Sequence, residues 1–243
     1  MTPERIARLR AVLDRRQPDL TVITDFVHKQ RNTSAIVRIC DGVGIMRVHT
    51  VVEEQAYRAF RGTAMGSHNW VEVCRHESLQ DALATVRGGA MQVLAAHPAP
   101  GVLDYRSVDY TRPTALLLGT ERAGLSATAV DAADHCIAVP MMGMVSSYNV
   151  AVAAGMILAE AQRQRQAAGL YERCRIDEAT YRRLFFEWGH PQVRDFCQAR
   201  GLAYPALDAT GEIADAANWY AQVRERLAAA GATDELNPGE GDG

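Results

Sequence analysis

Two short apolar runs of the chain each end in a polar turn whose residue types could do chemistry. The run 115–119 (ALLLG) is followed by the carboxylate of Glu121, and the run 135–139 (HCIAV) is followed by MMGMVSSYN, which contains Ser147 and Asn149. Buried runs of this length are typical of strands in a parallel sheet. Ser147 and Asn149 precede an apolar helix, where side-chain oxygens can cap exposed N–H groups. Two strand ends and one helix start therefore predict a pocket.

A third apolar run ends in the turn 96–100, which contains His97. The three turns are rich in glycine, methionine and backbone donors, and they carry few charges. Backbone groups can read the edge of a base, and apolar and methionine side chains can cover its faces. The residues favour a ligand that bears an adenine without a polyphosphate, although tight turns of an α/β sheet without any ligand give the same pattern.

Asn32 and Arg38 stand where a candidate strand passes into a helix. If Asn32 marks this corner, both residues can face the same rim of the sheet, and Asn32 or Thr33 can cap the helix. A helix start favours anions, so these residues, together with Lys29 and Arg31, predict a phosphate site. An ordinary capped helix with a surface arginine is the alternative.

Several common sites are excluded by their missing residues. Gly42 and Gly44 precede a strand and lack the third glycine of a dinucleotide fingerprint, so nicotinamide chemistry is not expected. Gly119 and Gly124 have the spacing of a phosphate-binding P-loop, but Leu125 replaces its lysine. The histidines and cysteines form no metal-ligand spacing, and no G-x-S-x-G elbow supports a hydrolase. We therefore expect no metal.

The elements that must position these residues alternate between strands and helices. This alternation predicts an α/β fold with a mainly parallel six-stranded sheet and helices on both faces. The expected strands are 20–24, 45–52, 70–73, 91–96, 115–119 and 135–139.

Length and composition favour a single domain with appended helices, since the chain has 243 residues and is 48% hydrophobic. No run approaches the roughly 18 apolar residues of a membrane span, and the amino terminus has acids and no apolar signal core. Five cysteines, an odd number without a C-x-x-C pair, suit free thiols in a reducing compartment. We expect a cytoplasmic protein that does not enter a membrane.

Arginine makes up 25 of the 26 basic residues. Its planar donor fork suits phosphate, although a genomic bias toward arginine codons gives the same count. The charge is uneven, because residues 1–61 hold 11 basic against 7 acidic residues and residues 205–243 hold 2 against 8. A predicted helix over 3–16 could therefore contact a nucleic-acid backbone, and a solvated helix face is the alternative.

Three stretches resemble, in order, the three motifs of the SpoU branch of the SPOUT RNA 2'-O-methyltransferases. They are NTSAIVR (32–38), LLLGTERAG (116–124) and VPMMGMVSSYNV (139–150). The arginine-rich first helix, RRQPDLTV (15–22) and EAQRQRQ (160–166) further resemble the family members that act on a D-loop guanosine of tRNA.

This resemblance implies a deep carboxy-terminal trefoil knot, a homodimer with the active site at the subunit interface, and S-adenosyl-L-methionine bound in the knot. It implies methyl transfer to the ribose 2'-OH of guanosine 18 in the D-loop of tRNA. The alternatives are 2'-O-methylation of ribosomal RNA or of the tRNA wobble nucleotide, and a non-catalytic RNA-binding protein on the same fold.

The resemblance also assigns roles by position. Arg38 would take the proton of the 2'-OH or only position a phosphate, and Tyr148 departs from the leucine usual beside the cofactor. The residues assigned to catalysis are Arg38, Asn32, Glu121, Ser147 and Asn149. Those assigned to the cofactor are Ala96, His97, Leu118, Gly119, Val139, Met141, Met144 and Tyr148. Those expected to bind RNA are Arg8, Arg15, Arg16, Arg61, Arg163, Arg165 and Arg173.

Four segments are expected along the chain. They are an amino-terminal arginine-rich helix (1–18), a methyltransferase domain with the knot (19–168), a carboxy-terminal helical extension (169–230) and a disordered acidic tail (231–243).

Overall fold

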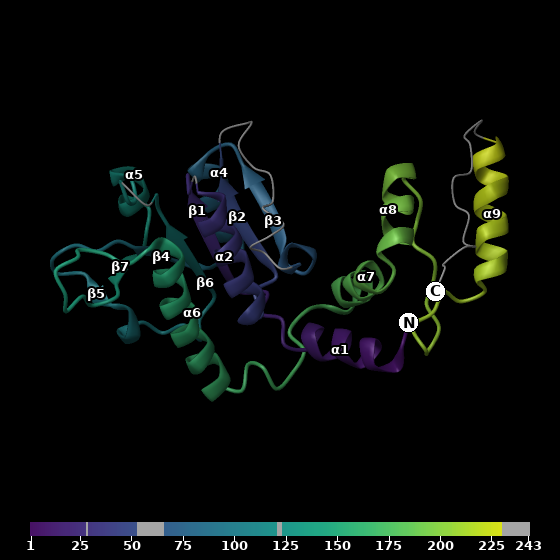
Figure 1. Cartoon of the computed structure of the whole chain (residues 1–243), viewed down its shortest axis with the longest axis horizontal. Helices are drawn as coiled ribbons and strands as arrows, with labels where there is room; N and C mark the ends of the chain where they lie inside the picture. The colour runs from purple at the N-terminus through teal and green to yellow at the C-terminus, as the bar shows by residue number, and fades with distance from the viewer. Residues whose placement is uncertain (28, 53–65, 121–122, 230–243) are drawn as a thin grey trace. The chain divides into compact units, whose positions relative to one another are not determined.

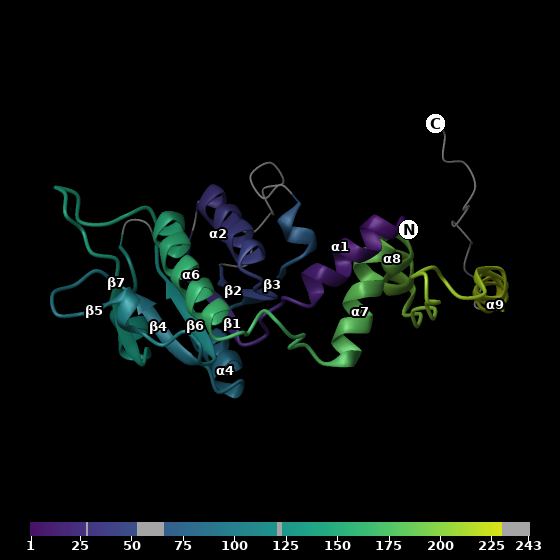
Figure 2. The ribbon, with the colours of Figure 1, turned by 90° about the horizontal axis from the view of Figure 1, so that it is seen from below.

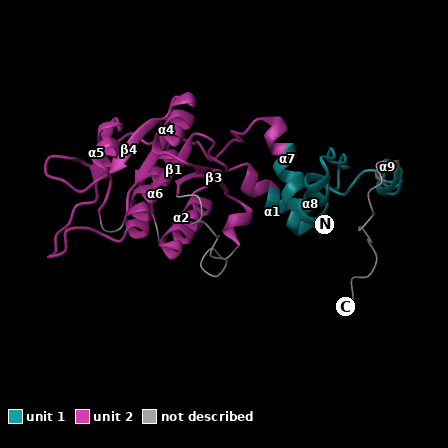
Figure 3. Cartoon of the chain, turned by 90° about the horizontal axis from the view of Figure 1, so that it is seen from above, with its two compact units in different colours: residues 1–9, 182–243 teal, residues 10–181 magenta. Residues whose placement is uncertain are grey.

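The computed structural model describes the chain over residues 1–27, 29–52, 66–120 and 123–229 (Figure 1). The chain forms two compact units, one of residues 10–181 and the other of residues 1–9 together with 182–243 (Figure 3). The larger unit contains the sheet, and the smaller unit is helical. None of the helices in the described ranges is long and apolar enough to cross a membrane.

The sheet has seven strands in the order β3-β2-β1-β6-β4-β7-β5, and every pair is parallel. The mainly parallel sheet is confirmed, but the expected number of six strands is wrong. The additional strand, β5, has only two residues, and so short a segment has no hydrophobic period to recognise. The strands are β1 (Leu20–Asp25), β2 (Arg47–Val51), β3 (Glu72–His76), β4 (Gln92–Ala96), β5 (Leu103–Asp104), β6 (Thr114–Leu118) and β7 (His135–Ala138).

Helices cover both faces of this sheet, as expected. On one face, α2 (Gln30–Gly42) and α6 (Val150–Ala167) pack on the strands in one hydrophobic cluster. On the other face, α4 (Leu79–Gly88) and α5 (Ala127–Asp131) form a second cluster. Figure 2 shows α2 and α6 on one side of the strands and α4 on the opposite side. Strands β1 and β6 are buried along their whole length because both of their faces are covered.

Side-chain caps start α4 and α6. The hydroxyl of Ser78 accepts a hydrogen bond from the amide of Asp81, and Asn149 Oδ1 accepts bonds from the amides of Ala151 (2.9 Å) and Val152 (3.4 Å). Each cap satisfies amides that have no partner inside the helix. The predicted cap is confirmed at Asn149.

The start of α2 differs from the prediction. The helix begins at Gln30, and the Lys29 carbonyl accepts bonds from the amides of Asn32 (2.8 Å) and Thr33 (3.2 Å). Asn32 therefore lies in the first turn rather than at the cap. Its side chain accepts a hydrogen bond from Asn149, which lies elsewhere in the sequence.

The remaining helices belong wholly or partly to the smaller unit. Its core contains Phe186, Phe196 and Cys197, with Tyr204 and Trp219 packed against them. These helices are α1 (Pro3–Leu13), α7 (Glu178–Gly189), α8 (Pro191–Arg200) and α9 (Ala216–Ala229). All five cysteines are free thiols.

Candidate functional site

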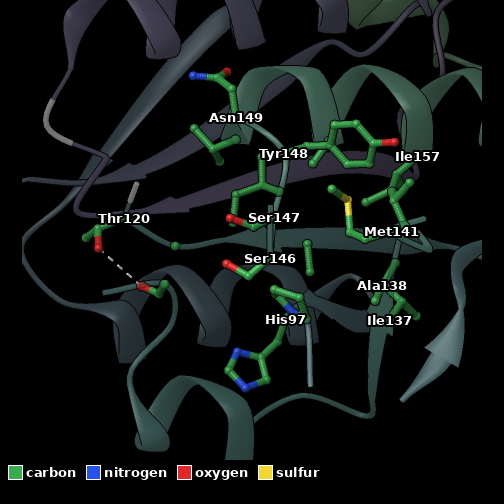
Figure 4. A pocket seen from close by; sticks show the side chains of 18 of the residues that line it. His97, Thr120, Ile137, Ala138, Met141, Ser146, Ser147, Tyr148, Asn149 and Ile157 are labelled. Atoms are coloured by element: carbon green, nitrogen blue, oxygen red, sulfur yellow. Dashed lines mark hydrogen bonds between the residues drawn. The ribbon is translucent and has the colours of Figure 1, made fainter. Parts of the chain in front are cut away.

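A cavity of about 330 Å³ lies at the carboxyl ends of three strands (Figure 4). Its walls come from residues 96–98 after β4, 118–120 after β6, 137–139 at β7 and 146–150 before and at the start of α6. In a parallel sheet the carboxyl ends of all strands lie at one edge, which is why turns far apart in the sequence meet here. Its size and apolar lining with a few polar groups suit a small organic ligand.

The turn after β6 forms one wall and depends on glycine. Thr120 and Gly124 exchange backbone hydrogen bonds of 2.9 and 3.0 Å. A Cβ atom on Gly119 would lie 2.3 Å from the carbonyl of Gly124, and Gly124 itself has φ +67°, in the left-handed region that favours glycine. A side chain at position 119 would therefore push this wall out of place.

A hydrogen bond between Asn149 and Asn32 joins two of the predicted motifs. Asn149 Nδ2 donates to Asn32 Oδ1 at 3.2 Å, although the residues are 117 positions apart. Asn149 also caps α6 through its oxygen. One side chain thus fixes the start of α6 against the first turn of α2, beside the cavity that Asn149 lines.

The other residues assigned to catalysis lie in different surroundings. Ser147 lines the cavity, between Tyr148 and Ser146 in Figure 4. Arg38 is exposed on α2, the helix that carries Asn32. Glu121 lies outside the described residues. The structure therefore brings together Asn32, Ser147 and Asn149.

Most residues assigned to the cofactor line the cavity. Met144 is the exception, since its side chain is fully exposed in the loop before α6 and is absent from the lining. The assignment of Met144 to the cofactor stays a prediction that this cavity does not support. Tyr148 lies toward Ile157 of α6 in Figure 4 and keeps 38% of its surface exposed. The residues that line the cavity as expected are Ala96, His97, Leu118, Gly119, Val139, Met141 and Tyr148.

The sequence prediction missed several lining residues. Ser146 could have been found from its place beside Ser147, and Thr120 from its place in the glycine turn. Ala153 and Ile157 lie further along α6, and only the packing of this helix over the strand ends places them at the cavity.

Four of the arginines expected to bind RNA are exposed, namely Arg8, Arg15, Arg163 and Arg173. Arg163 forms an ion pair with Glu160 at 2.7 Å. The hydrogen bond from Arg163 is the largest cause that lowers the pKa of Glu160, to about 2. Arg61 lies outside the described residues.

Arg16 and Arg165 are buried, which corrects their assignment to an RNA surface. Arg16 is 1% exposed and binds the Asp41 carboxylate at 2.7 Å and the Ile45 carbonyl at 3.0 Å. Arg165 is 0% exposed and binds Asp19 at 2.7 Å. Both guanidinium groups are used inside the protein, because a buried charge must be paired. No local pattern indicates this burial, since arginine is usually exposed.

Within the described ranges, no group of three or more histidine, cysteine, aspartate or glutamate residues is arranged to hold a metal ion.

Comparison with sequence profiles adds the family relationship. The profile described as the SpoU rRNA Methylase family matches residues 19–159, and a profile described as SpoU, rRNA methylase, C-terminal matches residues 163–216. The first of these spans all of the cavity walls, together with Asn32 and Arg38.

Three known proteins show how far the similarity extends. The tRNA (guanosine(18)-2'-O)-methyltransferase of Escherichia coli K12 is 45% identical over 92% of this chain and 99% of its own length. The crystal structure of the A. aeolicus TrmH/SpoU tRNA modifying enzyme matches with a TM-score of 0.73 and 38% identity, over 78% of this chain and 97% of that one. An AdoMet-bound rRNA methyltransferase from Sinorhizobium meliloti matches with a TM-score of 0.55 and 30% identity, over 64% and 59%.

Proposed function

The chain belongs to the SpoU methylase family, and from this premise we propose that it methylates the ribose 2'-OH of guanosine 18 in the D-loop of tRNA, with S-adenosyl-L-methionine as the methyl donor. The observation that carries this proposal is the high identity to the E. coli enzyme over nearly the full length of both chains.

The cavity at the strand ends is the proposed donor site. Residues of the turns after β4, β6 and β7 line it, and its walls include Met141, Ile157 and Tyr148. These groups fit a purine with a thioether-like tail, because peptide groups can bind a base edge and apolar side chains its faces. S-adenosyl-L-methionine supplies a methyl group on a positively charged sulfur. Gly119 lacks the side chain that would clash with Gly124 in the turn after β6.

The acceptor side of the site is assigned to α2. Arg38 is exposed there, where a guanidinium can bind an RNA phosphate and stabilise the negative charge that develops on the ribose oxygen. Arginine is a poor base because its pKa exceeds about 12. Arg38→Ala is expected to lower single-turnover methylation at least about 100-fold. A pH–rate profile of the parent protein without a titrating group attributable to Arg38 supports the positioning role over proton transfer.

A second copy of the chain is the proposed partner at the exposed apolar surface beside the cavity. Large apolar side chains are exposed there, and a surface of this kind is typical of a protein interface. A homodimer is expected in sedimentation equilibrium, and Val145→Asp with Val152→Asp is expected to shift it to the monomer. The exposed residues are Leu103, Met142, Met144, Val145, Tyr148 and Val152.

The tRNA substrate and the free thiols of all five cysteines support a cytoplasmic location. The four segments expected from the sequence and the trefoil knot stay predictions for this chain. Exposed Arg8, Arg15, Arg163 and Arg173 are the proposed phosphate contacts in the described ranges.

The decisive assay measures transfer of a tritiated methyl group to an unmodified tRNA transcript. Incorporation at guanosine 18 is expected, and a transcript with deoxyguanosine at this position should accept no methyl group because it lacks the 2'-OH. Absence of incorporation into any tRNA refutes the proposal.

The second candidate is 2'-O-methylation of ribosomal RNA, which is favoured by the similarity to the S. meliloti rRNA methyltransferase. Incorporation into ribosomal RNA fragments but not into tRNA would select it. Calorimetric titration with S-adenosyl-L-methionine separates both enzymes from a non-catalytic RNA-binding protein, which need not bind the donor.

A further inference from the structure

A buried polar cluster lies where β1 begins, at the edge of the sheet opposite to the donor cavity. The guanidinium of Arg165 lies at its centre. Each of the five N–H donors of this group has an acceptor. The acceptors are Tyr110 O (2.8 Å), Gln17 Oε1 (3.0 Å), Asp19 Oδ1 (2.7 Å), Asp19 O (3.1 Å) and Arg112 O (3.0 Å).

A second arginine, Arg175, binds the same carboxylate. Its Nη1 donates to Asp19 Oδ1 at 2.7 Å and its Nη2 to Asp19 Oδ2 at 2.9 Å, which is a two-point contact. Burial alone would raise the pKa of Asp19, but the hydrogen bonds from Arg175 and Arg165 lower it. Arg175 follows α6 in the sequence, so this contact ties the segment after α6 to the start of β1.

The segment after α6 is fixed at further points. The Tyr171 hydroxyl donates to the Val43 carbonyl at 2.8 Å, and Gln17 Nε2 donates to the Leu170 carbonyl at 3.0 Å. Arg173 lies between Tyr171 and Arg175, so its backbone is held on both sides.

The same cluster holds the backbone of Arg15. Gln17 Nε2 lies 3.2 Å from the Arg15 carbonyl, as well as 3.0 Å from that of Leu170. A Cβ atom on Gly44 would lie 2.7 Å from the Arg15 carbonyl and 3.5 Å from the Tyr171 ring. The chain at Arg15 and the chain at 170–171 therefore lie side by side, although they are far apart in the sequence.

The side chains of Arg15 and Arg173 both reach solvent. Arg15 and Arg173 are exposed, and among the described residues Arg173 has no hydrogen-bond or ion-pair partner. Within the same described ranges, the Arg15 guanidinium donates a hydrogen bond only to the carbonyl of Ala11, at 3.2 Å. The neighbouring carboxylate of Glu172 lies toward Gly169, where a Cβ atom would be 3.3 Å from its Oε2.

We propose that the Gln17–Asp19–Arg165–Arg175 cluster positions Arg15 and Arg173 as one preformed clamp for an RNA phosphate, with Arg175 as the positioning residue. The inference rests on the proposed RNA substrate. A held backbone leaves less conformational entropy to lose when the two guanidinium groups bind a phosphate. Arg175 itself acts through its contact with Asp19 and does not contact the RNA.

A double-mutant cycle tests this role. Binding of unmodified tRNA to the full-length protein is measured by fluorescence anisotropy across a series of salt concentrations, without methyl donor. Arg173→Ala is expected to weaken binding roughly three- to tenfold and to reduce the slope of log K against log salt by about 0.9, the value for one lost phosphate contact. Arg175→Ala should weaken binding to a similar extent but change the slope less, because Arg173 can still reach the phosphate, and the double variant should bind no more weakly than Arg173→Ala alone.

Two further variants keep the test decisive. Arg175→Lys keeps the charge but loses the two-point contact with Asp19, so it should bind tRNA as weakly as Arg175→Ala. Arg87→Ala is the control. Arg87 is an exposed arginine on α4, the helix on the opposite face of the sheet from α2 and α6, and it pairs with Asp134. The tRNA affinity of this variant should equal that of the parent.

Additive losses in the double variant, parental affinity in Arg175→Lys, or no effect of Arg175→Ala would each overturn the proposal. The double-mutant cycle measures tRNA binding alone, so its result can be interpreted whether or not the parent protein methylates tRNA. A parent protein that transfers no methyl group refutes the proposed function instead.

Discussion

His49 should make the stability of the larger unit depend on pH. It is 5% exposed on β2, and its Nδ1 lies 2.9 Å from Nε2 of His76 on β3. Burial, followed by the nearby charges of His76 and Arg47, lowers the pKa of His49 from 6.5 to about 4. The folded protein therefore keeps His49 neutral at pH values where the unfolded chain protonates it.

The difference between the two pKa values determines how the free energy of unfolding changes with pH. Between pH 6.5 and pH 4 the unfolded state binds the proton more tightly, so the free energy of unfolding is highest above pH 6.5 and falls as the pH drops toward 4. For these two pKa values the loss between pH 7 and pH 5 is about 2 kcal/mol, since each pKa unit is worth about 1.4 kcal/mol. Residual access of water reduces it to between about 1 and 2 kcal/mol.

The measurement is urea unfolding at pH 7 and pH 5 in a background with Trp188→Phe and Trp219→Phe. In this background Trp70 alone reports fluorescence, and it lies in the larger unit. His49→Gln can still hydrogen-bond to His76 but cannot take up a proton. Its loss of stability between the two pH values should be smaller than that of the parent by about 1–2 kcal/mol.

Cys74→Ser is the matched control. Cys74 pairs with His49 across β2 and β3, and its raised pKa lies far above this pH range. The control should show the full loss of the parent. An equal loss in His49→Gln and the parent would refute the assignment to His49.

Three further predictions concern the site and its supports. Gly119→Ala should weaken donor binding at least about tenfold in calorimetry and leave the circular dichroism spectrum unchanged, because its Cβ atom would meet the Gly124 carbonyl at 2.3 Å; parental affinity would contradict the assignment of this wall. Asn149→Ala should lower the free energy of unfolding by about 1 kcal/mol because the cap of α6 is lost. Asn149→Asp keeps this cap but loses the N–H that donates to Asn32. Methylation should therefore fall in both variants, whereas the free energy of unfolding should fall mainly in Asn149→Ala. Arg165→Met should destabilise the protein by about 3–5 kcal/mol in urea unfolding because two oxygens of Asp19 and three other acceptors lose a buried donor. Arg163→Met, two positions away and exposed, should change stability by less than about 1 kcal/mol.

The class of fold and the place of the cavity can be predicted from the sequence alone. Alternating apolar runs and helices predict a parallel sheet, and in such a sheet the turns after β4, β6 and β7 must meet at one edge. The caps of α4 and α6 also follow from local sequence, because Ser78 and Asn149 bond to amides only two or three residues away. These features depend on short-range chemistry and on periodicity, which one sequence contains.

Which polar residues face inward depends on long-range packing that the sequence does not reveal. Arg165 and Arg163 are two positions apart in a polar stretch of α6, yet one is completely buried and the other is exposed. The difference depends on Asp19, which lies 146 positions upstream and can be paired with Arg165 only when β1 and the end of α6 are packed together. Likewise, Asn32 meets Asn149 through the packing of α2 on α6. Long-range contacts of this kind carry no local signal, because an arginine or asparagine has the same sequence neighbours whether it is paired inside the fold or exposed to water.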